Sequence, residues 1–184
     1  MDKNHSQVGA NKILVAYASR GGSTSGVAEA IGSTLAEHGL EVEVRPMQAV
    51  HDLTPYRAVV AGSAIRIDQW LPEARQFMQR HQQELTQKPF AAFLVCLALA
   101  TKNARQRERA EQTAATWLQP VRNLVHPVSE GLFAGVLDIS KLPEVRYRLA
   151  FRLVLATGLW SEGDYRDWDA IRRWANTLPA KLLA

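Results

Sequence analysis

The sequence is poor in cysteine and contains no long apolar run. Cys96 is the single cysteine, so no internal disulfide can form, and no set of cysteine and histidine residues has metal-ligand spacing. No stretch approaches the roughly 20 apolar residues that a membrane-spanning helix needs. Residues 1–11 are polar and lack the apolar segment of a signal peptide. We therefore expect a cytoplasmic protein without a metal site, in which residues 1–11 form a flexible tail.

The composition is that of a globular protein. The chain has 184 residues, of which 47% are hydrophobic and 22% are charged. This length suits a single domain, which we place at residues 12–184. The net charge of +4 permits attraction to a membrane surface, a nucleic acid or an acidic partner. No known nucleic-acid-binding module is recognisable in the sequence, so we expect no nucleic-acid partner.

Two common glycine-rich phosphate motifs are also absent. There is no G-x-G-x-x-G, and the loop Ser19–Thr24 lacks the lysine that follows the last glycine of a P-loop. The loop nevertheless follows an apolar run, Ile13–Tyr17, which suits a strand buried on both faces. Its glycines allow a tight turn, and its hydroxyls and amides could bind a phosphate at the start of the next helix. An ordinary strand-to-helix turn capped by Ser23 or Thr24 is the alternative.

Apolar patterns predict strands and helices in alternation along the chain. Glu41–Arg45 alternates with period two, which is typical of a half-exposed strand at a sheet edge. We expect Gly39 to end the first helix and Pro120 to bend or end the third. The expected strands are Ile13–Tyr17, Glu41–Arg45, Ala58–Gly62, Phe90–Leu97 and Leu132–Leu137. The expected helices run from Ser23 to His38, from Pro72 to Leu85, from Arg105 to Val121 and from Trp168 to Leu178.

This alternation, with right-handed crossovers, predicts a doubly wound α/β sandwich around a five-stranded parallel sheet. Ligands of such sheets bind at the carboxyl ends of the strands. Three loops leave the sheet at that edge, namely Ser19–Thr24, Ser63–Trp70 and Leu97–Thr101. We therefore expect the binding site to lie among these three loops.

The first loop resembles the FMN phosphate loop of flavodoxins. Ser19–Thr24 has the pattern S-x-x-G-x-T, and a flavodoxin-like three-layer fold implies the strand order 2-1-3-4-5. Two further segments, Gly62–Arg66 and Tyr165–Trp168, resemble the menaquinone-dependent protoporphyrinogen oxidase branch of flavodoxin-like proteins. In that branch tyrosine and histidine usually follow the Ile-Arg pair, where Ile67–Trp70 stand in this chain. The resemblance covers roughly residues 12–180.

The resemblance implies one bound FMN, and the flavin itself carries out the redox chemistry. The first loop would hold the phosphate, and the second and third loops would flank the isoalloxazine ring. Arg20 would either pair with the phosphate or point to solvent. The implied FMN-binding residues are Ser19, Arg20, Gly21, Gly22, Ser23, Thr24, Ser63, Ala64, Ile65, Arg66, Trp70, Leu97, Ala98, Leu99 and Ala100.

Several residues of the second and third loops admit more than one interpretation. Trp70 would stack on the flavin, or it would be an ordinary core or surface tryptophan. Arg66 would stabilise a reduced anionic flavin, hold a propionate of a porphyrin-like substrate, or form a surface salt bridge. Leu97–Ala100 has no aromatic side chain, so it would leave a flavin face open to a flat substrate or would simply be packed.

An insertion before the last helix is not needed by a minimal flavodoxin. Leu142–Trp160 combines apolar residues and a tryptophan with Arg146, Arg148 and Arg152. A basic amphipathic helix of this kind could lie peripherally on the inner face of a membrane and bring a quinone to the flavin. The alternative is that it packs against the sheet or against a second copy of the chain in a homodimer.

The function that the sequence and the resemblance favour is that of an FMN-dependent oxidoreductase. It would take electrons from a reduced, protoporphyrinogen-like small molecule and pass them to a quinone. The first alternative is a flavodoxin-type electron carrier between protein partners; such carriers usually present an acidic face, and the charge of +4 weighs against this. The second alternative is a flavin-free binding module that has kept the fold.

Overall fold

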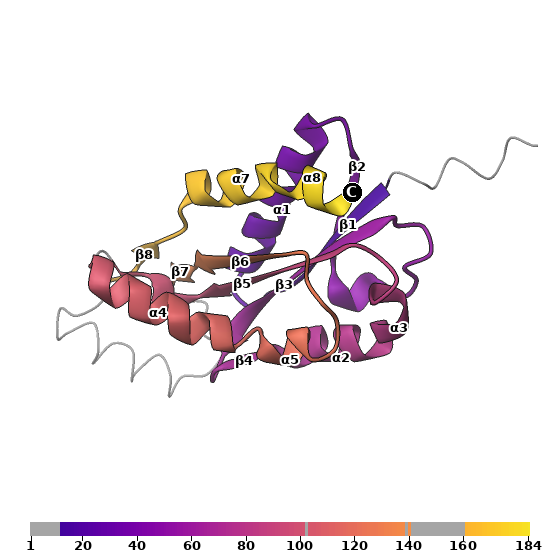
Figure 1. Cartoon of the computed structure of the whole chain (residues 1–184). Coiled ribbons are helices and arrows are strands. Elements are labelled where there is room, and N and C mark those ends of the chain that lie inside the picture. The colour runs from indigo at the N-terminus through magenta and orange to yellow at the C-terminus, as the bar shows by residue number, and fades with distance from the viewer. Residues whose placement is uncertain (1–11, 102, 139, 141–160) are drawn as a thin grey trace, which may run out of the picture.

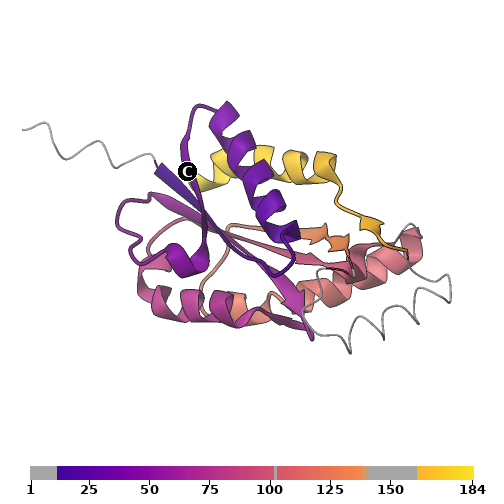
Figure 2. The same cartoon turned by 180° about the vertical axis from the view of Figure 1, so that it is seen from behind.

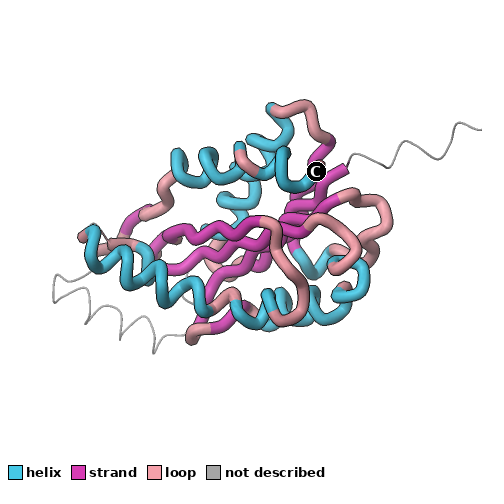
Figure 3. The backbone as a smooth tube through the Cα atoms, in the orientation of Figure 1, coloured by secondary structure: helices cyan, strands magenta, loops and turns pink. Residues whose placement is uncertain are grey.

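The computed structural model describes residues 12–101, 103–138, 140 and 161–184. The predicted N-terminal tail and the insertion Leu142–Trp160 lie outside the described residues. Within them, a central sheet separates two layers of helices (Figure 3). The predicted α/β sandwich is therefore confirmed.

Parallel strands form the centre of the fold in the order β2-β1-β3-β5-β6. Without the short β4, this is the predicted order 2-1-3-4-5, and β2 lies at the sheet edge as predicted. The pairs are in continuous register, for example Val15 with Val60 and Gly62 with Phe93. The five strands are β1 (Lys12–Ala18), β2 (Glu41–Pro46), β3 (Ala58–Arg66), β5 (Phe90–Cys96) and β6 (Ser129–Ala134).

Helices cover both faces of this sheet (Figures 1 and 2). On one face lie α1 (Ser23–Glu37), α7 (Trp168–Asn176) and α8 (Leu178–Leu182), and on the other lie α2 (Pro72–Arg80), α3 (Gln82–Leu85), α4 (Ala104–Thr116) and α5 (Gln119–Arg122). The described residues also form the short 3-10 helices η1 (Met47–Ala49) and η2 (Leu97–Leu99).

The near-continuous apolar run of β1 is explained by these two layers. Ile13 and Val15 pack into the core under α1 and α7, whereas Leu14 and Ala16 pack into the core on the side of α2. Side chains alternate between the faces of a strand, so a strand covered on both sides needs apolar residues at every position. The strand therefore holds both helix layers to the sheet.

The helix ends lie close to their predicted positions. Gly39 adopts a φ of +76°, and its N–H donates to the carbonyl of Ala36 at 2.9 Å, which is a left-handed cap after α1. The expected third helix is divided into two helices. α4 ends at Thr116, and Pro120 lies in the first turn of α5, where a proline is tolerated.

The second loop is the main departure from the predicted fold. β3 continues to Arg66 and pairs in antiparallel fashion with β4 (Gln69–Trp70), so most of the predicted loop Ser63–Trp70 is a hairpin. The two turn residues, Ile67 and Asp68, have φ angles of 50° and 56°. Two positive φ angles match the twist of a tight hairpin, but neither residue is the glycine or asparagine that would signal such a turn in a sequence. The side chain of Ile67 is 78% exposed.

The last predicted strand, Leu132–Leu137, is also corrected. β6 begins earlier, at Ser129, and ends at Ala134. Gly135 then separates it from β7 (Val136–Leu137), which pairs with β8 (Gly163–Asp164) in a small second sheet. This pairing joins residues on either side of the insertion, and therefore no local sequence pattern announces it.

Replacing Gly62 with alanine should destabilise the fold. A Cβ atom at this position would lie 2.1 Å from the ring of Phe93, its partner across the β3–β5 pair. We expect the Gly62→Ala variant to lose about 2–3 kcal/mol of unfolding free energy in urea titrations, which is typical of overpacking in a filled core.

Gly163→Ala is the matched control for this experiment. Its Cβ would meet only the Tyr165 ring at 3.9 Å, which is an ordinary contact, so we expect a change within about 0.5 kcal/mol. Equal stability of the two variants would contradict the account of Gly62. Shortening Phe93 to leucine in the Gly62→Ala background should restore part of the lost stability.

Candidate functional site

The first loop folds tightly between β1 and α1. Ser19 Oγ accepts a hydrogen bond from the N–H of Gly22 at 3.1 Å, and Gly22 has a φ of 85°. The first hydrogen bond of α1 runs from the N–H of Gly26 to the carbonyl of Gly22 at 3.2 Å. The amides of residues 23–25 therefore precede the helical hydrogen bonds and face out of the helix start.

The start of α1 is suited to an anion. No side chain caps it, and its first turn contains no acidic residue. Thr24 is fully buried, yet its hydroxyl has no hydrogen-bond partner among the described residues. A buried hydroxyl without a partner costs about 1–3 kcal/mol. Outward-facing amides, the positive end of the helix dipole and this hydroxyl together form a set of donors that a phosphate would satisfy.

Arg20 has a neighbour that the sequence did not suggest. Its guanidinium forms an ion pair with Glu73 at the start of α2, with Nη2 and Oε2 3.4 Å apart. The arginine side chain is 56% exposed, so this pair contributes little to stability. It does connect the first loop to the helix that follows the hairpin.

The second loop uses its serine inside the protein. Ser63 is fully buried, and its Oγ accepts the N–H of Leu71 at 3.0 Å and donates to the carbonyl of Ala64 at 2.8 Å. These bonds hold the end of β3 to the start of α2. Ala64 and Ile65 are partly buried against the core, and Arg66 is exposed near the hairpin turn.

Trp70 lies in the core. Its side chain is only 4% exposed, and it belongs to the apolar cluster that contains Leu71 and Ala74. This position corresponds to the core alternative considered for Trp70. Its Nε1 atom is buried and has no hydrogen-bond partner among the described residues.

The third loop forms the 3-10 helix η2 and borders a pocket. Leu99 is buried at 3% exposure, Leu97 and Ala100 are partly buried, and Ala98 is exposed. The N–H of Ala100 donates to the carbonyl of Leu97 at 2.9 Å, which keeps this turn compact. The loop thereby presents small apolar side chains, as predicted from its composition.

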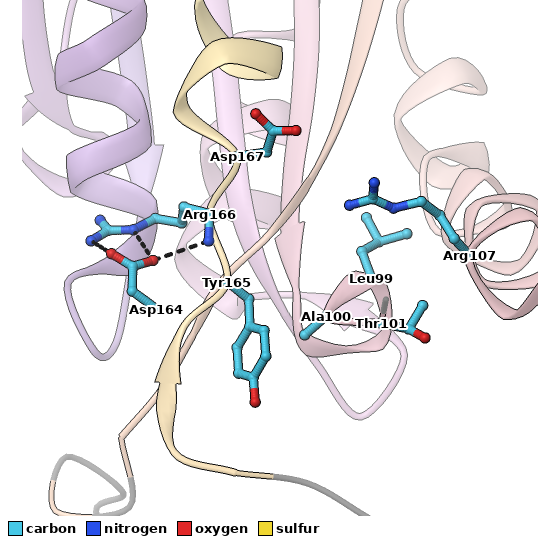
Figure 4. Close-up of a pocket in the computed structure, with 8 residues that line it drawn as sticks. All are labelled: Leu99, Ala100, Thr101, Arg107, Asp164, Tyr165, Arg166 and Asp167. Atoms are coloured by element: carbon cyan, nitrogen blue, oxygen red, sulfur yellow. Dashed lines mark hydrogen bonds and ion pairs between the residues drawn. The ribbon is translucent and has the colours of Figure 1, made fainter. Parts of the chain in front are cut away.

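The pocket has a volume of about 410 Å³ and lies between the third loop and the segment that leads into α7 (Figure 4). Figure 4 shows Tyr165 on one side and Thr101 with Arg107 on the other. The lining residues are Leu99, Ala100, Thr101, Arg107, Asp164, Tyr165, Arg166 and Asp167. Sequence analysis assigned no site role to Arg107 or to residues 164–167, although it singled out Tyr165–Trp168 for the family resemblance.

The two carboxylates of the pocket are already engaged. Asp164 accepts hydrogen bonds from Arg166 Nε at 2.8 Å and Nη2 at 2.6 Å, and this hydrogen bonding lowers the pKa of the Asp164 carboxyl. Asp167 Oδ1 accepts the N–H of Ala170 at 2.9 Å and caps α7. Arg107 has no ion pair with any residue that the structure describes, so its guanidinium is available to a ligand, although the two arginines and two aspartates of the pocket lining balance in formal charge.

The segment after the insertion reaches back to the first loop. The N–H of Tyr165 donates to the carbonyl of Gly135 at 3.1 Å. A Cβ atom on Gly135 would lie 3.5 Å from Ser23 Oγ. Ser23, Gly135 and Tyr165 therefore lie side by side at the carboxyl edge of the sheet, where the three loops were expected to meet.

The described residues include neither a metal-binding cluster nor a membrane-spanning helix. No group of three or more histidine, cysteine, aspartate and glutamate side chains in these ranges is placed to hold a metal ion. No helix within the same ranges has the length and apolar character required to cross a membrane.

Comparisons with known proteins agree with this architecture. A family model described as "Flavodoxin domain" matches residues 14–164. The chain is 24% identical to the "Protoporphyrinogen IX dehydrogenase (quinone)" of Escherichia coli (strain K12), over 91% of this chain and 94% of that protein. It is 26% identical to the protein of the same name from Leishmania major, over 94% of this chain and 77% of that protein.

Solved structures share the fold at low sequence identity. A flavodoxin from the domain Archaea has a TM-score of 0.55 at 19% identity, covering 94% of this chain and 99% of that one. The flavodoxin from Streptococcus pneumonia TIGR4 has a TM-score of 0.51 at 14% identity, covering 92% and 99%. The family implies a flavin cofactor, and the donors at the start of α1 fit a flavin that carries a phosphate.

The thiol of Cys96, at the end of β5 beside this site, should react slowly in the native protein. Burial raises the pKa of the Cys96 thiol from its ordinary value of 9.0 to about 11. At pH 9 the native protein should therefore hold only about 1% thiolate, whereas the unfolded chain holds about half. Burial thus favours the neutral thiol, and the associated stability is fully present below pH 9 and is lost as the pH rises toward 11.

We expect iodoacetamide to alkylate the native protein at pH 9 at least about tenfold more slowly than the urea-unfolded chain. Mass spectrometry of timed samples measures both rates on the same residue, because the chain has one cysteine. Equal rates would mean that Cys96 is accessible and ionised in the folded protein.

Proposed function

We propose that this chain, which belongs to the flavodoxin domain family, is an FMN-dependent oxidoreductase that passes electrons from a reduced, protoporphyrinogen-like substrate to a quinone. The observation that carries the proposal is the buried Thr24 hydroxyl, which lacks a partner among the described residues, at an uncapped helix start. The substrate and the quinone are taken from the names of the relatives in Escherichia coli and Leishmania major.

The first loop would hold the phosphate of FMN. The amides of Ser23, Thr24 and Ser25 and the hydroxyl of Thr24 supply neutral donors, and Gly21 leaves open space beside them. Ser19 acts indirectly, because its Oγ fixes the amide of Gly22 and so the shape of the turn. When bound, FMN supplies the hydride and single-electron chemistry that no side chain in this site offers.

The pocket beside the third loop is where we place the electron-donating substrate. Its wall includes the ring of Tyr165, and Leu99 and Ala100 add apolar surface. A flat aromatic wall with small aliphatic neighbours suits a planar molecule. The guanidinium of Arg107, which has no ion pair within the described part of the chain, suits a molecule that also carries a carboxylate. A tetrapyrrole with propionate groups combines both properties.

An electron-carrier function is the second candidate, because flavodoxin structures share this fold. Carriers that dock on protein partners usually do so through an acidic surface, whereas this chain has a net charge of +4 and a basic residue in its pocket. The insertion 142–160 lies outside the described residues, so both interpretations of it, contact with a membrane interface and a quinone or packing against protein, stay predictions. The positive charge of the chain therefore favours the oxidoreductase over the electron carrier.

The purified protein should contain FMN and should pass electrons to a quinone. We expect a yellow protein with close to one FMN per chain, measured by absorbance after extraction. We also expect the flavin, photoreduced with EDTA as the electron donor, to be reoxidised anaerobically by menadione, and to turn over repeatedly when the light and EDTA reduce it again. A colourless protein that stays colourless with added FMN would exclude both the enzyme and the carrier. A yellow protein without quinone turnover would leave the carrier.

The charge of Arg107 should matter only for a carboxylated ligand. We expect the Arg107→Gln variant to bind protoporphyrin IX about five- to tenfold more weakly than the unmodified protein, because one charge-assisted hydrogen bond is lost. Binding of the uncharged dimethyl ester of the same porphyrin should not change. Fluorescence titration measures both affinities.

Arg109→Gln is the matched control for this titration, since Arg109 is an exposed arginine of α4 outside the pocket lining. It should leave both affinities unchanged. An equal loss for the acid and the ester in the Arg107 variant, or the same loss in both variants, would contradict a specific carboxylate contact.

A further inference from the structure

Arg166 lies over the first turn of α1, although it comes from the segment after the insertion. Its Nη1 atom is 2.6 Å from the point that a Cβ on Gly26 would occupy. The guanidinium also stacks on the ring of Trp168, with 4.2 Å between Cζ and the ring centroid. Figure 4 shows the side chain extending from the strand-like segment toward α1. Gly26 therefore provides the space that lets an arginine lie against the helix.

The backbone fixes this segment independently of the side chain. Asp164 pairs with Val136 in the β7–β8 ladder, and the N–H of Tyr165 donates to the carbonyl of Gly135. Gly135 in turn lies beside Ser23 of the first loop. Arg166 is thus held at the start of α1 by hydrogen bonds on the sheet edge, and its side chain is only 17% exposed.

A cation at this position is electrostatically unfavourable without an anion nearby. The start of α1 is the positive end of the helix dipole, and its first turn supplies no acidic side chain. Asp164 provides one negative charge and accepts hydrogen bonds from Nε and Nη2 of the guanidinium. Nη1 forms no hydrogen bond with any residue that the structure describes. The buried hydroxyl of Thr24, also in the first turn of α1, likewise has no hydrogen-bond partner among these residues. The start of α1 therefore offers an anion two kinds of donor, namely Nη1 of Arg166 and the neutral donors of the first loop.

We propose that Arg166 is the cationic part of the phosphate site, and that it makes the protein select FMN over riboflavin. The inference deepens the proposed function, because it assumes that the flavin phosphate binds at the start of α1. A guanidinium beside a phosphate dianion adds charge to the neutral donors of the loop. Asp164 and Trp168 act as positioning residues that hold the guanidinium in place.

The test compares two flavins that differ only in the phosphate. Apoprotein is titrated with FMN and with riboflavin, and the quenching of flavin fluorescence gives each dissociation constant. We expect Arg166→Gln to weaken FMN binding by about tenfold or more, as for the loss of a hydrogen bond to a charged group. Riboflavin binding should change less than about twofold, since riboflavin has no phosphate for Arg166 to contact. Arg166→Lys should keep part of the preference, because it retains the charge but not the planar donors.

Arg172→Gln is the control, since Arg172 is an exposed arginine of α7 that forms an ion pair with Asp169 in the same helix. It should leave both dissociation constants unchanged. Gly26→Ala is a second variant that keeps Arg166 but fills the space under it, and it should also reduce the ratio of FMN to riboflavin affinity. Circular dichroism of each apoprotein verifies that the fold is intact.

The outcomes separate this inference from the proposed function. An unmodified apoprotein that binds neither flavin would overturn both. If it binds FMN but Arg166→Gln weakens FMN and riboflavin equally, Arg166 only supports the fold and the inference is wrong. The inference would also fail if the unmodified protein bound the two flavins with equal affinity. A selective loss of FMN affinity in the Arg166 and Gly26 variants, with Arg172→Gln unchanged, supports it.

Discussion

A helix that starts directly after a buried parallel strand leaves amide groups that need an acceptor. In this chain β1 is covered on both faces, so the turn after it cannot move away from the sheet edge. Gly22, with its positive φ, reverses the chain within this restricted space, and no side chain caps α1. The fold thereby creates a positive, donor-rich point, and the surrounding segments are arranged around it.

The segments that surround this point differ in the charge that they contribute. The first loop contributes neutral donors, and its arginine is paired with Glu73. The segment 164–167 contributes a paired arginine and aspartate, and α4 contributes Arg107. A phosphate-bearing cofactor and a carboxylated substrate would be held in such a site by different cations. Such a division suits an enzyme, because each ligand can leave without disturbing the charge partner of the other.

Much of the fold could be predicted from the sequence because its signals are local. The apolar run of β1, Gly39 after α1 and Pro120 at the start of α5 each reflect the geometry of a few adjacent residues. The hairpin β3–β4 was missed because Ile67 and Asp68 adopt positive φ angles without the glycine or asparagine that marks such a turn in a sequence. No sequence signal pointed to the roles proposed for Arg107 and Arg166. Tyr165–Trp168 stood out only for the family resemblance, and both proposed roles depend on contacts between segments far apart in the sequence.

The contact between Gly26 and Arg166 has a consequence for the order in which the protein matures. The first loop leaves the ribosome well before Arg166 and Trp168, whose side chains lie against Gly26 in the first turn of α1. If they complete the site, a nascent chain can form the β1–α1 turn long before it can hold the cofactor firmly. Cofactor loading is then a late event, which follows the docking of α7 on the finished sheet and serves as a check that the whole domain has folded.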